Sequence, residues 1–214
     1  DRLGVSRPSL REAISTLQVR GLLTTKANAG VFVAELLGAP FSPSLTELFS
    51  THDEAVFDYI SFRSDLEGMA AERVANLGSK TDLKVIQAIF DKMKVAHDNK
   101  DTSEEASLDA QFHMAIIEAS HNVFLLHMVR SMFEMLKKGI FYNRQVMFSR
   151  HTTRGTLLEQ HRSICNAIQN RNAKGARKAI EDHMDFIKTC MQEVKKAEAN
   201  EEIAKLRLDH TTTS

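Results

Sequence analysis

Residues 4–33 have the sequence GVSRPSLREAISTLQVRGLLTTKANAGVFV, and they define the N-terminal part of the fold. Ser6 is a residue type that caps helices, and Pro8 falls in the first turn after it, where proline is well accepted. Gly21 predicts the end of this helix. The stretch 22–36 then has two short segments around a turn at residues 28–30, which predicts a β-hairpin. We expect its strands at Leu22–Thr25 and Val31–Ala34.

The first turns of this helix carry residue types that contact DNA. Arg7, Ser9 and Arg11 point outward, as in a recognition helix that meets base edges and phosphates. The helix N-terminus itself favours phosphate, and Gly30 would let the hairpin approach the minor groove closely. The alternative is that this helix and hairpin belong to an unrelated fold and that the arginines are simply solvated. The charge of the segment, taken alone, favours this alternative.

The stretch 4–33 resembles the C-terminal half of the winged helix-turn-helix of GntR-family regulators, including the glycine–aromatic–valine strand of the wing. The resemblance implies an operator of double-stranded DNA, contacted here by Ser6, Arg7, Ser9 and Arg11. It also implies that the first helix of the motif precedes Asp1. We therefore expect residues 1–36 to be a truncated winged helix.

Composition is that of a globular protein. Apolar residues make up 43% and charged residues 26% of the 214 residues, and the formal net charge is zero, so any DNA-binding surface must be local. No apolar run approaches the roughly 20 residues that span a bilayer. We expect a cytoplasmic protein without membrane contact, with Cys165 and Cys190 as free thiols.

Proline marks the division of the chain. Pro8, Pro40 and Pro43 all lie in the first 43 residues, and the proline-free remainder predicts helices. We expect a linker at 37–43, a helical domain at 44–199 and a frayed tail at 200–214. Short connections predict a mainly α fold, an antiparallel helical bundle. The expected helices are 44–50, 53–77, 81–99, 103–120, 122–149, 154–171 and 173–198.

Four polar residues of the bundle form a candidate metal site. Asp109 and His113 are spaced i and i+4, so they share one helix face. His161 and His183 lie on the apolar, core-facing stripes of two later helices. Each histidine alone is more often a hydrogen-bonded core residue. Together with a buried carboxylate, however, they favour a divalent cation, with Zn²⁺ as the first choice and Ni²⁺ or Mn²⁺ as alternatives.

Three segments resemble the FCD domain, the ligand-binding domain of the FadR subfamily of GntR regulators. They are FRSDLEGMAAERVA (62–75), DAQFHMAIIEASHN (109–122) and EQHRSICNAIQNRNAKGARKAIEDHM (159–184). The resemblance implies that the same four residues are the metal ligands and that Arg63 holds the carboxylate of an effector. The alternative for Arg63 is a structural ion pair with Glu67 at i+4.

These features together predict a homodimeric transcriptional repressor controlled by a small carboxylate that completes the coordination of the metal. Residues 119–132 (ASHNVFLLHMVRSM) resemble regulators of pyruvate and lactate metabolism, which implies a two- or three-carbon hydroxy- or keto-acid. One alternative is a metal-dependent hydrolase or transferase, although no general base is evident. The others are a regulator that senses the metal itself and a purely structural metal.

Overall fold

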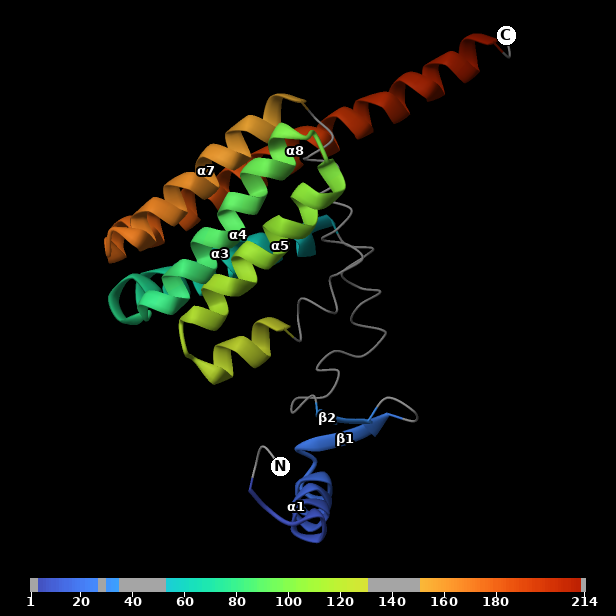
Figure 1. Ribbon diagram of the computed structural model, residues 1–214. Coiled ribbons are helices and arrows are strands. Elements are labelled where there is room, and N and C mark those ends of the chain that lie inside the picture. The colour runs from blue at the N-terminus through green and yellow to red at the C-terminus, as the bar shows by residue number, and fades with distance from the viewer. Residues whose placement is uncertain (1–3, 27–29, 35–52, 131–150, 213–214) are drawn as a thin grey trace.

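The structure, a computed structural model, has two parts: a helix with a β-hairpin, and a helical bundle (Figure 1). The expected linker at 37–43, the expected helix at 44–50 and residues 131–149 of the helix expected at 122–149 lie outside the described residues. The described residues are 4–26, 30–34, 53–130 and 151–212.

The N-terminal unit is the predicted helix followed by the predicted hairpin. Helix α1 (Arg7–Val19) begins after Ser6, whose side-chain oxygen accepts a hydrogen bond from the backbone N–H of Ser9. Strands β1 (Leu23–Lys26) and β2 (Gly30–Val33) pair antiparallel, each within a residue of its predicted position. Gly30 opens β2 with a positive φ of 100°, a conformation that glycine adopts readily.

Helix α1 has no buried residue. The apolar side chains of Leu10, Ile14 and Leu17 are therefore only partly covered by the described residues, and Leu10 and Leu17 are each 36% exposed. A helix of 13 residues beside a two-stranded sheet is too small to enclose a core of its own.

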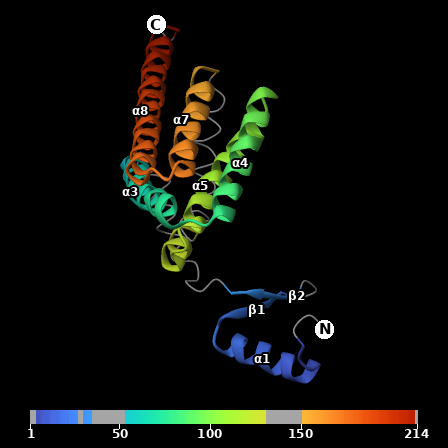
Figure 2. The same cartoon turned by 60° about the vertical axis from the view of Figure 1, so that its left-hand side comes forward.

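The bundle confirms the predicted fold class, and the described residues include five long helices of it. Figure 2 shows α4, α5, α7 and α8 running alongside one another. Helix α3 packs mainly against α8, α4 packs against α5, and α7 packs against both α8 and α4. Residues 123–130 are also helical. The bounds are α3 Asp53–Leu77, α4 Lys80–Asp98, α5 Thr102–Ala119, α7 His151–Gln169 and α8 Ala173–Thr212.

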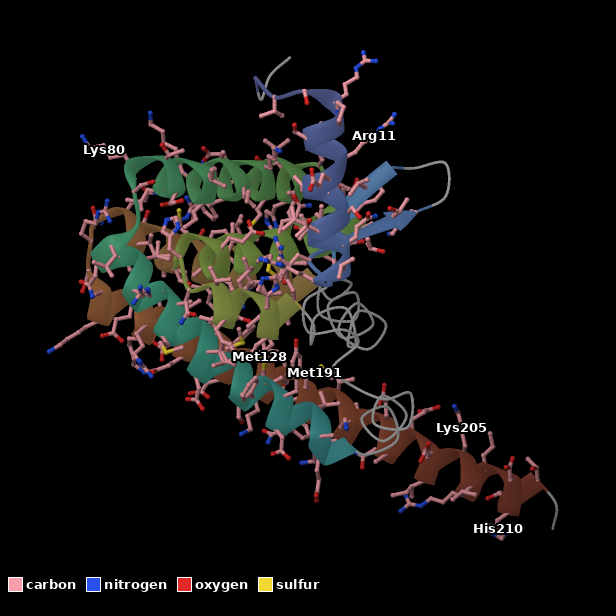
Figure 3. The ribbon with its side chains drawn as sticks, turned by 90° about the horizontal axis from the view of Figure 1, so that it is seen from below. Arg11, Lys80, Met128, Met191, Lys205 and His210 are labelled. Atoms are coloured by element: carbon pink, nitrogen blue, oxygen red, sulfur yellow. The ribbon has the colours of Figure 1, made fainter. Side chains whose placement is uncertain are left out.

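The prediction of a frayed tail after residue 199 is wrong, because α8 continues to Thr212. Figure 3 shows this end of the helix, with Lys205 and His210 labelled, extending past the bundle. Its composition is rich in good helix formers, and Glu201 lies 3.9 Å from Lys205 at the favourable i, i+4 spacing. Ile203, Leu206 and Leu208 are exposed there. No helix in the described part of the chain is both long and apolar enough to cross a membrane.

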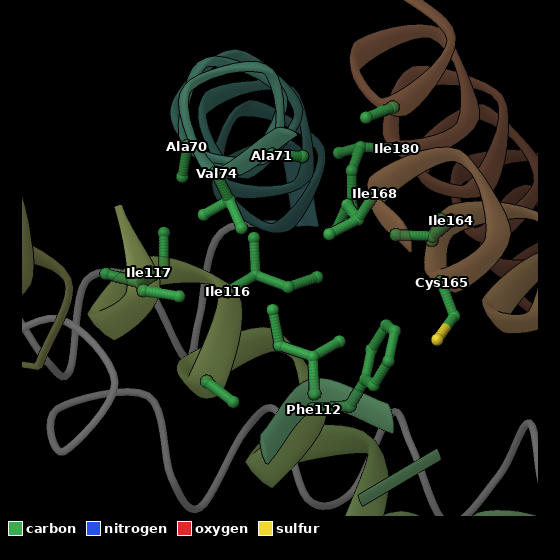
Figure 4. Close-up of a cluster of buried hydrophobic side chains, with 14 of the residues drawn as sticks. Ala70, Ala71, Val74, Phe112, Ile116, Ile117, Ile164, Cys165, Ile168 and Ile180 are labelled. Carbon is green, nitrogen blue, oxygen red and sulfur yellow. The ribbon is translucent and has the colours of Figure 1, made fainter. Parts of the chain in front are cut away.

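The hydrophobic core lies where α3, α4, α5, α7 and α8 meet, and Figure 4 shows a part of it. Phe112 and Ile116 of α5 are at its centre, with exposures of 0% and 1%. Ile164 and Ile168 face them from α7, while Ile180 contributes from α8. The faces that carry the candidate metal ligands continue these apolar faces, so the core fixes where the polar side chains lie.

Candidate metal centre

The four predicted ligands lie together inside the bundle. Their ligand atoms all lie within 4.8 Å of one another, although three different helices supply them. Asp109 and His113 share the inner face of α5, while His161 and His183 come from the core-facing sides of α7 and α8. All four residues are buried, with exposures of 4%, 2%, 0% and 0% in that order.

His161 is held in a defined orientation by its own helix. Its Nδ1 atom lies 2.7 Å from the backbone oxygen of Leu157. A carbonyl oxygen only accepts hydrogen bonds, so Nδ1 carries a proton, and in the neutral form of the ring the Nε2 atom has a free lone pair. This Nε2 atom lies 2.9 Å from Oδ1 of Asp109.

The other two imidazoles are oriented in the same sense. Nδ1 of His183 lies 2.9 Å from the side-chain oxygen of Gln160, and Nδ1 of His113 lies 2.5 Å from Oε2 of Glu67. Both contacts are to acceptor oxygens, so both rings also direct Nε2 inward. Each of the three histidines thus has an outer partner on Nδ1, as metal-binding histidines usually do.

This arrangement leaves the inner nitrogen atoms unsatisfied. Nε2 of His161 lies 3.3 Å from Nε2 of His113, and neither ring has a proton left for this contact once Nδ1 is protonated. Within the described residues, Nε2 of His183 has no hydrogen-bond partner. Buried lone pairs without a partner are costly. Three of them beside the Asp109 carboxylate fit a divalent cation such as Zn²⁺, which takes nitrogen and oxygen ligands.

The electrostatics favour the protonation state that a metal requires. Burial lowers the pKa of His183 well below the usual range, and the neighbouring His161 and His113 lower it further. Burial also lowers the pKa of His113, although Glu67 opposes that shift. Neutral imidazoles are the form that binds metal ions.

Arg63 forms the ion pair that was the alternative to effector binding. Its Nε atom lies 2.6 Å from Oε1 of Glu67, and both side chains are buried. Burial would raise the pKa of the Glu67 carboxyl, but Arg63 and His113 hold this pKa at about 2. Within the described residues, Nη2 of Arg63 has no hydrogen-bond partner, so one edge of the guanidinium is not used by the ion pair.

Sequence reasoning did not identify the residues around the ligands. Glu67 was considered only as a partner for Arg63, and its contact with His113 depends on how α3 packs against α5. Gln160 precedes His161 in the chain but contacts His183. In the sequence, only its position next to His161 marks Gln160 as a residue near the centre. That position does not indicate that Gln160 contacts His183.

A second buried polar network lies beside His161. Glu105, one turn before Asp109 on α5, accepts two hydrogen bonds from Arg154 of α7, at 2.7 and 2.9 Å. Nδ1 of His97 lies 2.8 Å from the same carboxylate. A small cavity beside the network is lined by Met93, Glu105, Arg154, Leu158 and His161. The network joins the two helices that supply Asp109 and His161.

The cysteines lie outside the group of four. No disulfide joins Cys165 and Cys190, as predicted. The Cys165 thiol donates a hydrogen bond to the side-chain oxygen of Gln87 at 3.3 Å, and burial raises its pKa to about 11.

The predicted DNA-contacting residues are all exposed at the start of the N-terminal unit. Arg7, Ser9 and Arg11 lie on the first two turns of α1, and Arg11 is labelled in Figure 3. Ser6 and Ser9 are joined by a hydrogen bond of 2.8 Å between their hydroxyl groups. Gly30 is exposed at the start of β2. Their contact with DNA stays a prediction.

Comparison with known proteins identifies matches over most of the chain. The model of the FCD domain matches residues 58–186, and that of "Bacterial regulatory proteins, gntR family" matches residues 1–33. The Glc operon transcriptional activator of Escherichia coli K12 is 32% identical over 91% of this chain and 78% of its own length. The regulator LutR of Bacillus subtilis is 29% identical over 87% of this chain and 85% of its own length.

A solved structure shares the fold. The Streptococcus agalactiae protein GntR superposes with a TM-score of 0.59 at 23% identity, covering 88% of this chain and 84% of that protein. At this identity the likeness concerns the architecture alone.

Proposed function

Because the chain belongs to the GntR family and carries an FCD domain, it is a DNA-binding transcriptional regulator, and we propose that a divalent metal ion and a small carboxylate control it. The predicted family resemblance is thereby confirmed. The relatives are regulators, so the alternative of a hydrolase or transferase is excluded.

The proposal rests on the inward direction of the three Nε2 atoms. His113, His161 and His183 each have an outer partner on Nδ1, and Asp109 adds one carboxylate oxygen between them. When bound, the metal would act as a Lewis acid that attracts an anionic ligand. Three imidazoles and one carboxylate leave coordination positions for that ligand.

The carboxylate would also contact Arg63. The Nη2 atom of this buried guanidinium lacks a hydrogen-bond partner among the described residues, and a carboxylate is a good acceptor for it. Through Glu67, Arg63 is connected to His113, so the two proposed anchors for an effector are in one network. We propose a hydroxy- or keto-acid of two or three carbon atoms, because residues 119–132 resemble regulators of pyruvate and lactate metabolism.

The effector would act on the arrangement of the DNA-binding units. A winged helix reads one half-site, so a two-fold operator requires two copies of the chain, and we propose a homodimer. An effector that binds one arrangement of the two units more tightly shifts the population toward it. We expect repression in the absence of the effector, whereas the glc relative is named an activator.

Measuring how tightly the protein binds its operator under four ligand conditions tests this function. Fluorescence anisotropy of a labelled operator would be measured with metal-free protein, with Zn²⁺, with lactate or glycolate, and with Zn²⁺ plus the carboxylate. The proposal expects the carboxylate to change DNA affinity only when Zn²⁺ is present. A change with Zn²⁺ alone, with no further effect of carboxylates, would instead identify a metal sensor. No effect of either ligand would leave the metal a purely structural role.

A further inference from the structure

Glu67 contacts two functional groups at once. Its Oε1 atom lies 2.6 Å from Nε of Arg63, and its Oε2 atom lies 2.5 Å from Nδ1 of His113. The side chain is only 4% exposed. Helix α3, which carries Glu67, supplies none of the four candidate ligands, so this carboxylate links α3 to the centre.

Helix stability does not account for this arrangement. An i, i+4 pair such as Arg63 and Glu67 can form on a solvated helix face, where desolvation costs little. Here both charges are buried, and a buried ion pair is often no more stable than apolar side chains of the same size. A role for the carboxylate beyond the pair would explain why it is there, and its second oxygen meets His113.

We propose that Glu67 is the positioning residue that prepares His113 as a metal ligand, and that Arg63 fixes the carboxylate for this task. The inference rests on the proposed metal centre. An ionised carboxylate only accepts hydrogen bonds, so it selects the ring form with a proton on Nδ1 and a lone pair on Nε2. The contact between Oε2 of Glu67 and Nδ1 of His113 is close, but it does not meet hydrogen-bond geometry in this structure.

Glu67 differs from the other outer partners in two respects. Leu157 and Gln160 are neutral acceptors and both belong to α7, a helix that itself supplies a ligand. Glu67 is charged and comes from a helix without one. A charged acceptor makes the ligand more basic, so the metal is held more tightly. Any displacement of α3 that moves Glu67 away from His113 therefore weakens metal binding.

A pair of double variants isolates this role. Arg63→Met/Glu67→Gln and Arg63→Met/Glu67→Leu both remove the buried ion pair, so neither leaves an unpaired charge in the core. They differ in one property: the glutamine oxygen can still accept a hydrogen bond from Nδ1 of His113, and leucine cannot. Glu72→Gln, at a half-exposed position of α3 where the carboxylate pairs with Arg177, is the control for loss of a carboxylate charge away from the centre.

Two measurements are made on each protein. Nitrogen-15 NMR of the metal-free protein determines which nitrogen of His113 carries the proton, and competition with a chromophoric chelator gives the affinity for Zn²⁺. We expect the wild type, Glu72→Gln and the glutamine double variant to keep the proton on Nδ1, and the leucine double variant to lose that preference. Zn²⁺ affinity should be lower by about 10- to 100-fold with leucine than with glutamine.

The inference is overturned if both double variants have the His113 proton on the same nitrogen and bind Zn²⁺ with the same affinity. If the wild type binds no Zn²⁺, the proposed function fails, and the NMR arm still determines whether Glu67 positions His113. Circular dichroism of each variant establishes that it is folded before the comparison.

Discussion

The Nε2 atom of His161 lies 3.3 Å from the Nε2 atom of His113, and the Nδ1 atom of each ring faces an acceptor oxygen on its outer side. Two lone pairs at this distance repel each other. A cation between them and Oδ1 of Asp109 turns that repulsion into coordination, because imidazole nitrogen and carboxylate oxygen are both ligands for Zn²⁺. The packing of the bundle brings these two rings together, and the proposed regulation depends on the metal ion that they would bind.

Loss of one imidazole should remove the metal. We expect His161→Ala and His183→Ala to lower Zn²⁺ affinity by orders of magnitude, because the remaining ligands no longer complete the set. His210→Ala, at the exposed end of α8, is the matched control and should bind Zn²⁺ like the wild type. Chelator competition measures all three. Unchanged affinity in both ligand variants would contradict the site.

Metal removal should destabilise the bundle. A ligand that binds only the folded state stabilises it by about 4 kcal/mol when its free concentration is about a thousand times its dissociation constant. We expect the thermal midpoint of the wild type to rise with Zn²⁺ and to fall with a chelator, while that of His183→Ala responds to neither. Calorimetric melting measures this, and an equal response of both proteins would argue against a metal held by His183.

Carboxylate binding should depend on both the metal and Arg63. Titration calorimetry with glycolate, lactate and pyruvate should give binding that disappears with a chelator and weakens strongly in Arg63→Ala. Arg63→Lys is the matched variant, because it keeps the charge and loses the planar, forked donor group. Equal carboxylate binding by the metal-free protein would mean that the metal does not hold the effector.

The Glu105–Arg154 pair should stabilise the junction of α5 and α7. Both side chains are buried, so Arg154→Met leaves the Glu105 carboxylate with His97 in place of the guanidinium and should lower the free energy of unfolding by up to about 3–5 kcal/mol. Glu105→Leu combined with Arg154→Met should recover most of that loss, since no charge remains unpaired. Urea denaturation measures both variants. A double variant no more stable than Arg154→Met alone would show that the pair itself holds the two helices together.

Arg7 and Arg11 should determine DNA affinity. Replacing either by alanine should cost about 1–3 kcal/mol of operator binding if its side chain contacts a base. If it contacts a phosphate, binding weakens on all sequences and the salt dependence decreases. Lys80→Ala, at the start of α4, is the control. Affinity and salt dependence that stay unchanged in both arginine variants would exclude α1 as the recognition helix.

The sequence predicted the parts of this protein that follow from local periodicity. Asp109 and His113 were placed on one face by their spacing, and the apolar stripes around His161 and His183 placed both rings in the core. Contacts between helices were not predictable in this way. The pairing of Glu67 with His113 depends on the packing of α3 against α5, for which the sequence has no local signal.

Helix ends were predicted less well than helix faces. The helices expected at 81–99 and 103–120 begin one residue earlier, at Lys80 and Thr102, after the caps Ser79 and Asp101. Ser79 is favoured because it forms a reciprocal capping box with Asp82, which satisfies two backbone N–H groups at once. Several polar residues near a helix start can serve as caps, and the backbone angles decide among them.

X-ray absorption at the zinc edge of the Zn²⁺-loaded protein tests the metal centre most directly. We predict one ion per chain, with imidazole nitrogen and carboxylate oxygen ligands at about 2.0–2.2 Å and no sulfur scatterer. The imidazole signal should be lost in His161→Ala and His183→Ala. A sulfur ligand from Cys165 or Cys190, or a spectrum unaffected by both histidine substitutions, would contradict the centre described above.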